Sequence, residues 1–430
     1  MEVCLLKILV VGGGGREHAL IWKIARSPRV DKIYCAPGNA GTAELAENIT
    51  IKATDIPALV EFAKKEKIDL TIVGPESPLI AGIVDEFNRR GLKVFGPSKE
   101  GAQIEGSKAW AKQLMREANV PTAAYDTFTD LSTALARAKE HFSSLNTSPL
   151  VIKADGEAAG KGVFITRKLE EANIALKTIM EDREFGASGN LVVIEEYLEG
   201  QEATLMSFVS GENFVPMPAA QDYKRAYDND EGLNTGGMGC YSPVPVVPQD
   251  VYDGIIETII KPTLHTIAQR GIDFRGILYT GVVLTKDGPK VLEFNSRFGD
   301  PETQVVLPLL ESDLLDIIEM VVEGNLDSSK IKWYNKKAVC VVMASGGYPG
   351  DYKTGKPIMG LSEAQSAGAI VFHAGTKLAD SQVVTSGGRV LGITGVADSY
   401  GEAADVAYRV VNLISFDKMH YRKDIGARVR

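Results

Sequence analysis

The strongest chemical signal in the sequence is an acid, an amide and an arginine that follow one apolar run. Glu293 and Asn295 flank Phe294, and Arg297 comes two residues later. In a β-strand, residues two apart lie on one face, so the carboxylate and the amide oxygen would point the same way. Two such oxygens make a partial site for Mg²⁺, which phosphate oxygens and water complete. The guanidinium could then hold a phosphoryl group during its transfer, although an Arg–Glu pair at a surface strand end is the plain alternative.

A glycine-rich stretch at 151–163 predicts a loop that covers phosphate groups. It reads VIKADGEAAGKGV, and its candidate residues are two lysines and three glycines: Lys153, Lys161, Gly156, Gly160 and Gly162. It is not a Walker A loop, because the first two glycines are too close and the third stands where that motif needs Ser or Thr. We therefore expect a strand, a flexible loop that folds over a triphosphate, and a second strand. The alternative is a solvated hairpin turn, which would be costly to order without a ligand.

A second glycine-rich turn lies near the N-terminus, where a strand leads into a helix. Four glycines at 12–15 are followed by Arg16 and Glu17. Such a turn lets a phosphate approach the backbone and the free N–H groups of the helix start. It does not fit a dinucleotide fingerprint, because Glu17 takes the third glycine position and the second predicted strand ends without an acid. We expect a different phosphorylated small molecule here, or else a tight turn with no ligand. Asn39 and Glu76 follow neighbouring strands, so they would lie at the same edge of the sheet.

Two further segments have weaker signals on their own. The stretch at 191–202 reads LVVIEEYLEGQE, an apolar strand that ends in acids. Its backbone could bind adenine and Glu202 could accept hydrogen bonds from a ribose, but a strand that leaves a core usually ends in charge. The stretches QDYKR at 221–225 and NTGGMG at 234–239 form a polar loop that is either functional or a mobile surface loop.

The composition places the chain among ordinary globular proteins. Its 430 residues suggest roughly two to four domains, and 44% apolar against 24% charged residues are enough to build a core. The net charge of −9 and the pI of about 5.3 argue against a general basic surface for nucleic acid. The cysteines form no CxxC pair, so a zinc ribbon is not expected. Cysteines that stay free fit a reducing cytosol, so we expect a cytoplasmic protein, and the charge predicts no nucleic-acid partner. No apolar run reaches the roughly 18 residues that span a bilayer, so no membrane partner is expected.

The elements that must position these residues begin with an alternating pattern. In the first hundred residues, short apolar strands that end in Gly or Pro alternate with helical periods, which is typical of a parallel sheet in an α/β protein. The predicted strands are 7–11, 32–36, 69–73 and 92–95, and the predicted helices are 16–26, 56–67 and 79–90. A further helix is predicted to begin at Ser107, a good N-cap.

Beyond residue 122 the pattern changes. A small α+β lid is expected at about 122–198, with strands 150–154, 162–166 and 191–196 and helices 131–142 and 169–182. Next come predicted strands 202–209, 276–284 and 290–295 and a helix at 252–269. The last predicted elements are strands 338–344, 369–372 and 390–396 and a helix at 401–414.

Taken in order, these segments resemble the phosphoribosylamine–glycine ligase family of the ATP-grasp superfamily over essentially the whole chain. The segments that carry the resemblance are GGREHAL, APGNAGT, DLTIVGPE, EGSKAW, IKADGEAAGKGV, QDYKR, NTGGMG, EFNSRFGDPETQ, ASGGYPGDY and FHAGTKL. The resemblance implies an ATP-grasp fold with a Rossmann-like domain at 1–105, a core with the lid at 106–330, and a C-terminal α+β domain at 331–430. It also implies the ATP-dependent joining of glycine to 5-phospho-β-D-ribosylamine through a glycyl phosphate, in purine biosynthesis, by a monomer or a weak dimer.

The same resemblance assigns roles to individual residues. ATP would contact Lys108, Lys153, Gly156, Gly160, Lys161, Gly162, Glu195, Tyr197, Leu198 and Glu202. The two small substrates would contact Gly14, Gly15, Arg16, Glu17, Asn39, Glu76, Asp222, Lys224, Arg225, Gly236, Gly237 and Arg297. Glu293 and Asn295 would hold Mg²⁺ or Mn²⁺, and Lys153 and Arg297 would be the catalytic pair.

Two alternatives remain open at this point. Another ATP-grasp enzyme, such as a carboxylating purine enzyme, would need a bicarbonate site and would not predict the segments at 221–225 and 234–239. A Rossmann-type dehydrogenase or a non-catalytic nucleotide sensor is the second alternative. The missing fingerprint argues against the dehydrogenase, and Glu293, Asn295 and Arg297 together argue against the sensor.

Overall fold

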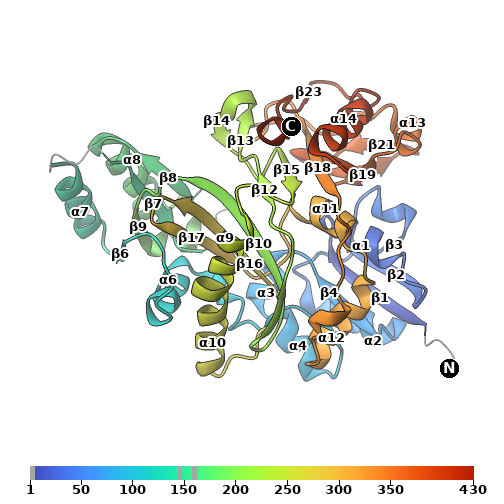
Figure 1. Cartoon of the computed structure of the whole chain (residues 1–430), viewed down its shortest axis with the longest axis horizontal. Helices are drawn as coiled ribbons and strands as arrows, with labels where there is room; N and C mark the ends of the chain where they lie inside the picture. The colour runs from blue at the N-terminus through green and yellow to red at the C-terminus, as the bar shows by residue number, and fades with distance from the viewer. Residues whose placement is uncertain (1–4, 144–147, 157–161) are drawn as a thin grey trace.

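The computed structural model describes residues 5–143, 148–156 and 162–430, and its first layer is the predicted parallel sheet. The strands run in the order β3-β2-β1-β4-β5, all parallel (Figure 1). They are β1 (Leu6–Gly12), β2 (Val30–Pro37), β3 (Glu47–Asn48), β4 (Leu70–Val73) and β5 (Val94–Phe95). The helices between and after them are α1 (Gly15–Ile24), α2 (Ile56–Glu66), α3 (Glu76–Ala81) and α4 (Ile83–Arg89). The α/β prediction is confirmed for this part of the chain.

One predicted helix is two helices in the structure. The helix expected at 79–90 begins earlier, at Glu76, and is interrupted at Gly82, whose φ of +94° lies in the left-handed region. Glycine adopts that conformation without a steric penalty, so Gly82 ends α3 and precedes α4. The earlier start places Glu76 in the first turn of α3, directly after the carboxyl end of β4.

The predicted lid is a four-stranded antiparallel sheet with two helices, at one end of the molecule (Figure 1). Its strands run in the order β6-β9-β7-β8, with bounds β6 (Tyr125–Phe128), β7 (Leu150–Ala154), β8 (Val163–Thr166) and β9 (Val192–Glu196). Helices α7 (Leu131–Ser143) and α8 (Leu169–Met180) share a hydrophobic core with it that is separate from the other cores. The sequence did not predict β6, because this edge strand is partly exposed along its whole length and lacks an apolar pattern.

The central sheet is antiparallel, and the end of its strand β17 lies at the cavity described below. Its strands run β11-β10-β16-β17, with bounds β10 (Gln201–Ser210), β11 (Asn213–Pro216), β16 (Arg275–Thr285) and β17 (Gly288–Asn295). Helix α6 (Lys108–Glu117) packs on it beside a long helix, which comprises α9 (Gln249–Ile255), a π-helical turn (Ile256–Ile260) and α10 (Lys261–Gln269). Among the residues that the structure describes, no helix is long and apolar enough to cross a membrane.

The last sheet combines strands from two distant parts of the chain. Its order is β12-β15-β18-β22-β19, with β23 beside β18. The bounds are β12 (Gln221–Asp222), β15 (Gly239–Ser242), β18 (Lys337–Ser345), β19 (Ile370–His373), β22 (Arg389–Ala397) and β23 (Met419–His420), and α14 (Tyr400–Val411) packs against β18 and β22. Between β12 and β15, β13 (Arg225–Tyr227) and β14 (Glu231–Asn234) form a separate hairpin. Smaller elements are α5 (Gln103–Gly106), α11 (Thr303–Val306), α12 (Leu314–Glu323), α13 (Leu361–Gln365), β20 (Thr376–Ala379) and β21 (Gln382–Thr385). The polar loop at 221–239 thus belongs to the same sheet as the C-terminal strands, and the domain boundary at residue 331 stays a prediction.

Candidate active site

A cavity of about 540 Å³ opens where the parallel sheet, the lid, the central sheet and the C-terminal sheet meet. The predicted site residues on its wall are Arg16, Glu76, Lys108, Lys153, Gly156, Gly162, Glu195, Asp222, Lys224, Gly236, Glu293, Asn295 and Arg297. Residues that the sequence analysis missed also line it: Glu105, Lys112, Tyr348 and Arg389. Two predicted residues, Gly160 and Lys161, lie outside the described residues.

One end of the cavity is built where α6 meets the end of β7. Ser107 caps α6 as predicted, because its hydroxyl accepts a hydrogen bond from the Trp110 N–H at 3.0 Å. The carboxylate of Asp155 accepts from the Ser107 hydroxyl at 3.1 Å and from the Ala109 N–H at 3.0 Å. The Lys108 ammonium donates to the carbonyl of Gly156 at 3.0 Å. The start of the glycine-rich loop is therefore fastened to the first turn of α6.

Two of the three lysines at this end, Lys112 and Lys153, share one carboxylate oxygen. The Nζ atoms of Lys153 and Lys112 lie 3.0 and 3.2 Å from the same oxygen of Glu195, Oε2. Burial lowers the pKa of Lys112 to about 8, against the attraction of Glu195, and the charge of Lys153 lowers it further. Burial also lowers the pKa of Lys108. The other Glu195 oxygen, Oε1, is buried and has no hydrogen-bond partner. Lys112 and Lys153 thus depend on one carboxylate oxygen, whereas Lys108 also lies near the carboxylates of Asp155 and Glu293.

The predicted metal ligands lie on β17 as the strand period requires. Glu293 faces Gly281 across the β16–β17 pairing, Asn295 faces Tyr279, and Phe294 is buried. Burial would raise the pKa of the Glu293 carboxyl, but nearby lysines and Arg297 outweigh it and hold that pKa below its usual range. The described residues contain no cluster of three or more His, Cys, Asp and Glu side chains that could hold a metal. A cation at Glu293 would thus depend on oxygens from a ligand and from water.

Arg297 is held by two carboxylates. Its Nε lies 3.2 Å from Glu76 Oε2, and its Nη2 lies 2.8 Å from Glu105 Oε1. The second oxygen of Glu105 accepts from the Ser296 N–H at 2.8 Å and from the Ser296 hydroxyl at 3.0 Å. Each oxygen of Glu105 thus has a donor, and the guanidinium has a defined orientation at the edge of the cavity.

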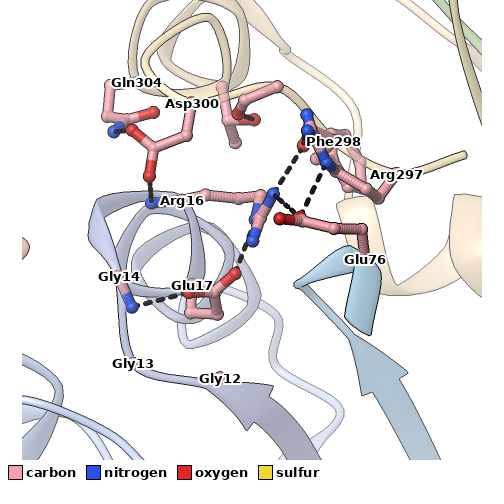
Figure 2. Close-up of polar contacts among 12 residues, drawn as sticks. Gly12, Gly13, Gly14, Arg16, Glu17, Glu76, Arg297, Phe298, Asp300 and Gln304 are labelled. Atoms are coloured by element: carbon pink, nitrogen blue, oxygen red, sulfur yellow. Dashed lines mark hydrogen bonds and ion pairs between the residues drawn. The ribbon is translucent and has the colours of Figure 1, made fainter. Parts of the chain in front are cut away.

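The side chain of Glu17 occupies most of the space inside the first glycine-rich turn. The Gly14 N–H donates to Glu17 Oε2 at 2.6 Å, and the Arg16 Nε donates to Glu17 Oε1 at 2.5 Å (Figure 2). A Cβ atom at Gly74 would stand 2.1 Å from that Oε1 atom. Arg16 also donates from Nη1 to the carbonyl of Phe298 at 3.1 Å, so its guanidinium points toward Glu76 and Arg297 (Figure 2). The glycines therefore make room for Glu17, and Arg16 is the residue of this turn that reaches the cavity wall.

The structure does not bring every predicted residue to the wall. Those outside it are Gly14, Gly15, Glu17, Asn39, Tyr197, Leu198, Glu202, Arg225 and Gly237. Asn39 is buried and fully bonded: it donates to the carbonyl of His373 at 2.8 Å and accepts from the N–H groups of Gly41 and Thr42. It joins the N-terminal sheet to the C-terminal sheet rather than facing open space. Arg225 donates to the carbonyl of Gly232 within the β13–β14 hairpin.

The opposite end of the cavity combines the polar loop with the C-terminal sheet. Lys224 Nζ lies 2.6 Å from Glu202 Oε2, which places Glu202 behind this end. Arg389 donates to the carbonyl of Asp300 at 2.8 Å and lies 3.4 Å from its carboxylate. No local pattern singles out Arg389, because its partners lie far away in the sequence. Burial raises the pKa of Asp222 to about 7, although the charge of Lys224 opposes this.

Comparisons with known proteins agree with this arrangement. Family models of phosphoribosylglycinamide synthetase match three consecutive parts: the N domain at 6–105, the ATP-grasp (A) domain at 106–303 and the C domain at 338–428. The chain is 54% identical to a phosphoribosylamine–glycine ligase of Caldanaerobacter subterraneus subsp. tengcongensis, over 98% of this chain and 100% of that protein. It is similar to the crystal structure of a phosphoribosylamine–glycine ligase from Thermotoga maritima, with a TM-score of 0.85 and 33% identity over 97% of this chain and 100% of that one. A biotin carboxylase from Campylobacter jejuni in complex with β,γ-ATP shares the fold, with a TM-score of 0.73 at 15% identity over 97% of this chain and 93% of that one.

Proposed function

The chain belongs to the phosphoribosylamine–glycine ligase family, and from this premise we propose how its cavity carries out the reaction. It is a ligase that forms a carbon–nitrogen bond: ATP drives the joining of glycine to phosphoribosylamine in purine biosynthesis. Its ATP-grasp fold binds ATP and typically a divalent metal ion. The residue roles below are our proposal, and the observation that carries it is that three lysines, Glu293, Asn295 and Arg297 line one cavity.

The chemistry requires an activated carboxyl group. A glycine carboxylate is a poor electrophile, because its negative charge repels an amine and its oxygen is a poor leaving group. We propose that a carboxylate oxygen of glycine attacks the γ-phosphorus of ATP, which releases ADP and forms glycyl phosphate. The ribosylamine nitrogen then attacks the carbonyl carbon, phosphate leaves with the C–O electron pair, and the nitrogen loses a proton to give the amide. Such steps need positioning, charge neutralisation and exclusion of water, with no nucleophilic side chain.

The lysine end is the proposed nucleotide site. Lys108 and Lys153 would bind the phosphates, and Lys112 would add a third positive charge behind Lys153. The unpartnered Oε1 of Glu195 is an acceptor at the cavity wall that an exocyclic amino group of adenine could satisfy. The predicted phosphate-covering loop lies mostly outside the described residues, and only its two ends, Gly156 and Gly162, line this end of the cavity. The lowered pKa values of Lys108 and Lys112 support this assignment, because burial disfavours their charged forms and a bound polyanion would stabilise them.

Glu293 and Asn295 are the proposed ligands of a divalent cation, Mg²⁺ or alternatively Mn²⁺. The donor set fits such an ion: one carboxylate stays ionised, because its pKa is lowered, and one amide oxygen lies two residues further along the strand. When bound, the cation neutralises charge on the phosphates. Arg297 would hold the transferring phosphoryl group, and Glu76 and Glu105 would keep its guanidinium in place.

The opposite end is the proposed site of the two small substrates. Asp222 and Lys224 on this wall could pair with the ammonium and carboxylate groups of an amino acid. A bound ammonium would favour the ionised form of Asp222, whose pKa is raised to about 7 without it. Arg16 would contact the phosphoribosyl group, with Arg389 as a further cation on the same wall. We propose that the protein acts as a monomer or a weak dimer, because the described residues of one copy form the cavity wall.

A reconstitution tests the function directly. The protein is mixed with ATP, Mg²⁺, glycine and freshly prepared phosphoribosylamine, and ADP release is followed with each component left out in turn. We expect ADP only when both small substrates are present, together with glycinamide ribonucleotide in a ratio of one to one. ADP release that does not depend on glycine would reject the proposal. A requirement for bicarbonate would favour a carboxylating enzyme.

A further inference from the structure

The β13–β14 hairpin has one end in the cavity wall and the other against the C-terminal tail. At its base, Lys224, Asn234 and Thr235 line the cavity, and the N–H of Thr235 donates to the Lys224 carbonyl at 2.7 Å. Figure 1 shows the hairpin beside β23 and the C-terminus. All four residues of β14 are exposed. Among the described strands, β13 pairs only with β14. A two-stranded hairpin is marginally stable on its own, so its position depends on what packs against it.

The tail supplies that packing through a buried arginine. The Arg422 side chain is 0% exposed, and its Nη1 donates to the carbonyl of Arg225 at 3.1 Å and to Asp230 Oδ1 at 3.0 Å. Its Nη2 lies 2.6 Å from Asp424 Oδ2, and its guanidinium stacks 4.7 Å from the centre of the Tyr223 ring. One guanidinium therefore joins the tail to the first arm of the hairpin, to its tip and to the residue before Lys224.

Further hydrogen bonds repeat the same connection. The Lys423 N–H donates to Asp228 Oδ1 at 2.8 Å, and the Asn229 N–H donates to Asp424 Oδ2 at 3.0 Å. His420 Nε2 lies 2.7 Å from the carbonyl oxygen of Ala226. The tail thus holds the turn of the hairpin through backbone and side-chain groups, although it lies almost two hundred residues further along the chain.

We infer that the tail segment 420–428 acts as a clamp, with Arg422 at its centre, that positions the β13–β14 hairpin and so sets the affinity of the enzyme for its small substrates. This inference rests on the proposed function, because it takes the wall at 222–236 to bind glycine and phosphoribosylamine. Arg422 touches no substrate and is a positioning residue. The nucleotide lysines lie on α6 and β7, which this clamp does not contact through any hydrogen bond or ion pair among the described residues. The clamp should therefore affect one end of the cavity and leave the other unchanged.

The test compares Arg422→Ala, Arg422→Lys and a control in the full-length protein. Arg430→Ala is the matched control, because Arg430 is an arginine of the same tail that pairs with Asp405, 3.3 Å away, and not with the hairpin. For Arg422→Ala we expect the KM for glycine, for phosphoribosylamine or for both to rise roughly tenfold, while the KM for ATP stays within about twofold. Arg422→Lys should recover part of the loss, because lysine keeps the charge but not the planar set of donors.

Amide hydrogen exchange gives a readout that does not depend on activity. Exchange at 225–234 should become faster in Arg422→Ala and remain unchanged at 108–117. If Arg422→Ala does not fold, Asp230→Asn replaces it, because Asp230 is half-exposed and its substitution weakens the clamp from the hairpin side. Unchanged exchange at 225–234, or a KM for ATP that rises as much as the others, would overturn the inference. Wild-type protein that makes no ADP from both substrates would instead reject the proposed function, so the two failures are distinguishable.

Discussion

The two ends of the cavity differ in how their positively charged side chains are paired. At the lysine end, Lys112 and Lys153 share one oxygen of Glu195, and Lys108 donates to the carbonyl of Gly156. At the other end, Arg297 and Arg389 each lie against carboxylates and carbonyl groups of the protein itself. The lysines are therefore held by fewer direct carboxylate contacts than the arginines.

This difference suggests separate roles for the two ends: the lysines bind phosphate groups, and the arginines are fixed donors. Burial lowers the pKa values of Lys108 and Lys112, and a bound triphosphate would stabilise their charged forms, so much of its binding free energy should come from this end. Arginines that are already bonded to carboxylates need little reorganisation when the substrate binds. They can therefore act as fixed hydrogen-bond donors while negative charge develops during phosphoryl transfer. Substitutions at the lysine end should mainly change nucleotide binding, and substitutions at Arg297 and its carboxylate partners should mainly change the rate of the chemical step.

The largest effect is expected for Glu293→Gln, which lies between the two ends. The amide keeps the shape but removes the negative charge that the surrounding lysines and Arg297 stabilise. We expect ADP release to fall by roughly a hundredfold or more, because metal binding and phosphate alignment fail together. Steady-state ADP release across a range of Mg²⁺ concentrations measures this. Glu257→Gln, a change at an exposed acid on the π-helical turn, is the control, and near-normal turnover of Glu293→Gln would remove the residue from the metal site.

Lys153→Met should have the next largest effect, and it tests the lysine end alone. We expect the Kd for ATP to rise by roughly tenfold to a hundredfold, because a buried charge-assisted contact to phosphate is lost. The KM for glycine should change much less. Nucleotide titration by calorimetry measures the change, with Lys177→Met on α8 of the lid as a control outside the cavity wall. Equal losses for ATP and for glycine would show that the two ends are not separate.

At both ends the sequence predicts some residues and misses others. Lys153, Glu293 and Asn295 could be predicted, because each lies in a short strand and the strand period fixes the face on which it lies. Glu105 and Arg389 could not, because their partners lie far away in the chain: Arg297 for the first and Asp300 for the second.

The same limit applies to the fold. The apolar strands and their parallel order follow from local patterns, whereas the exposed β6 and the split at Gly82 do not. Nor does any local pattern place the loop at 221–239 in one sheet with the C-terminal strands. Such pairings are set by contacts between distant segments, which one sequence does not reveal.

Glu105→Gln tests whether the orientation of Arg297 determines the rate of the chemical step. The amide keeps the size of the side chain but weakens the ion pair to Arg297, which retains Glu76 as its second partner. We expect kcat to fall by roughly tenfold with the KM for ATP unchanged, because the guanidinium stays close to its site but is less firmly oriented. Rapid-quench measurement of the first turnover separates this step from product release. A rise in the Kd for ATP without a change in kcat would contradict the distinction between the two ends.

The last prediction concerns the pH dependence of stability, and it tests Asp222 at the substrate end. Its pKa is raised from 3.8 to about 7, mainly by burial, so the folded protein keeps a proton that the unfolded chain releases at lower pH. The stability that this proton contributes is fully present below pH 3.8 and is lost as the pH rises to about 7. Relative to Asp222→Asn, the wild-type protein should lose at most about 1.4 kcal/mol of unfolding free energy per pH unit in that window, and nothing further above it. Urea unfolding from pH 4.5 to 8.5, without nucleotide and with a chelator present, measures both proteins. A difference between them that stays constant over this range would mean that Asp222 is ionised in the folded protein throughout.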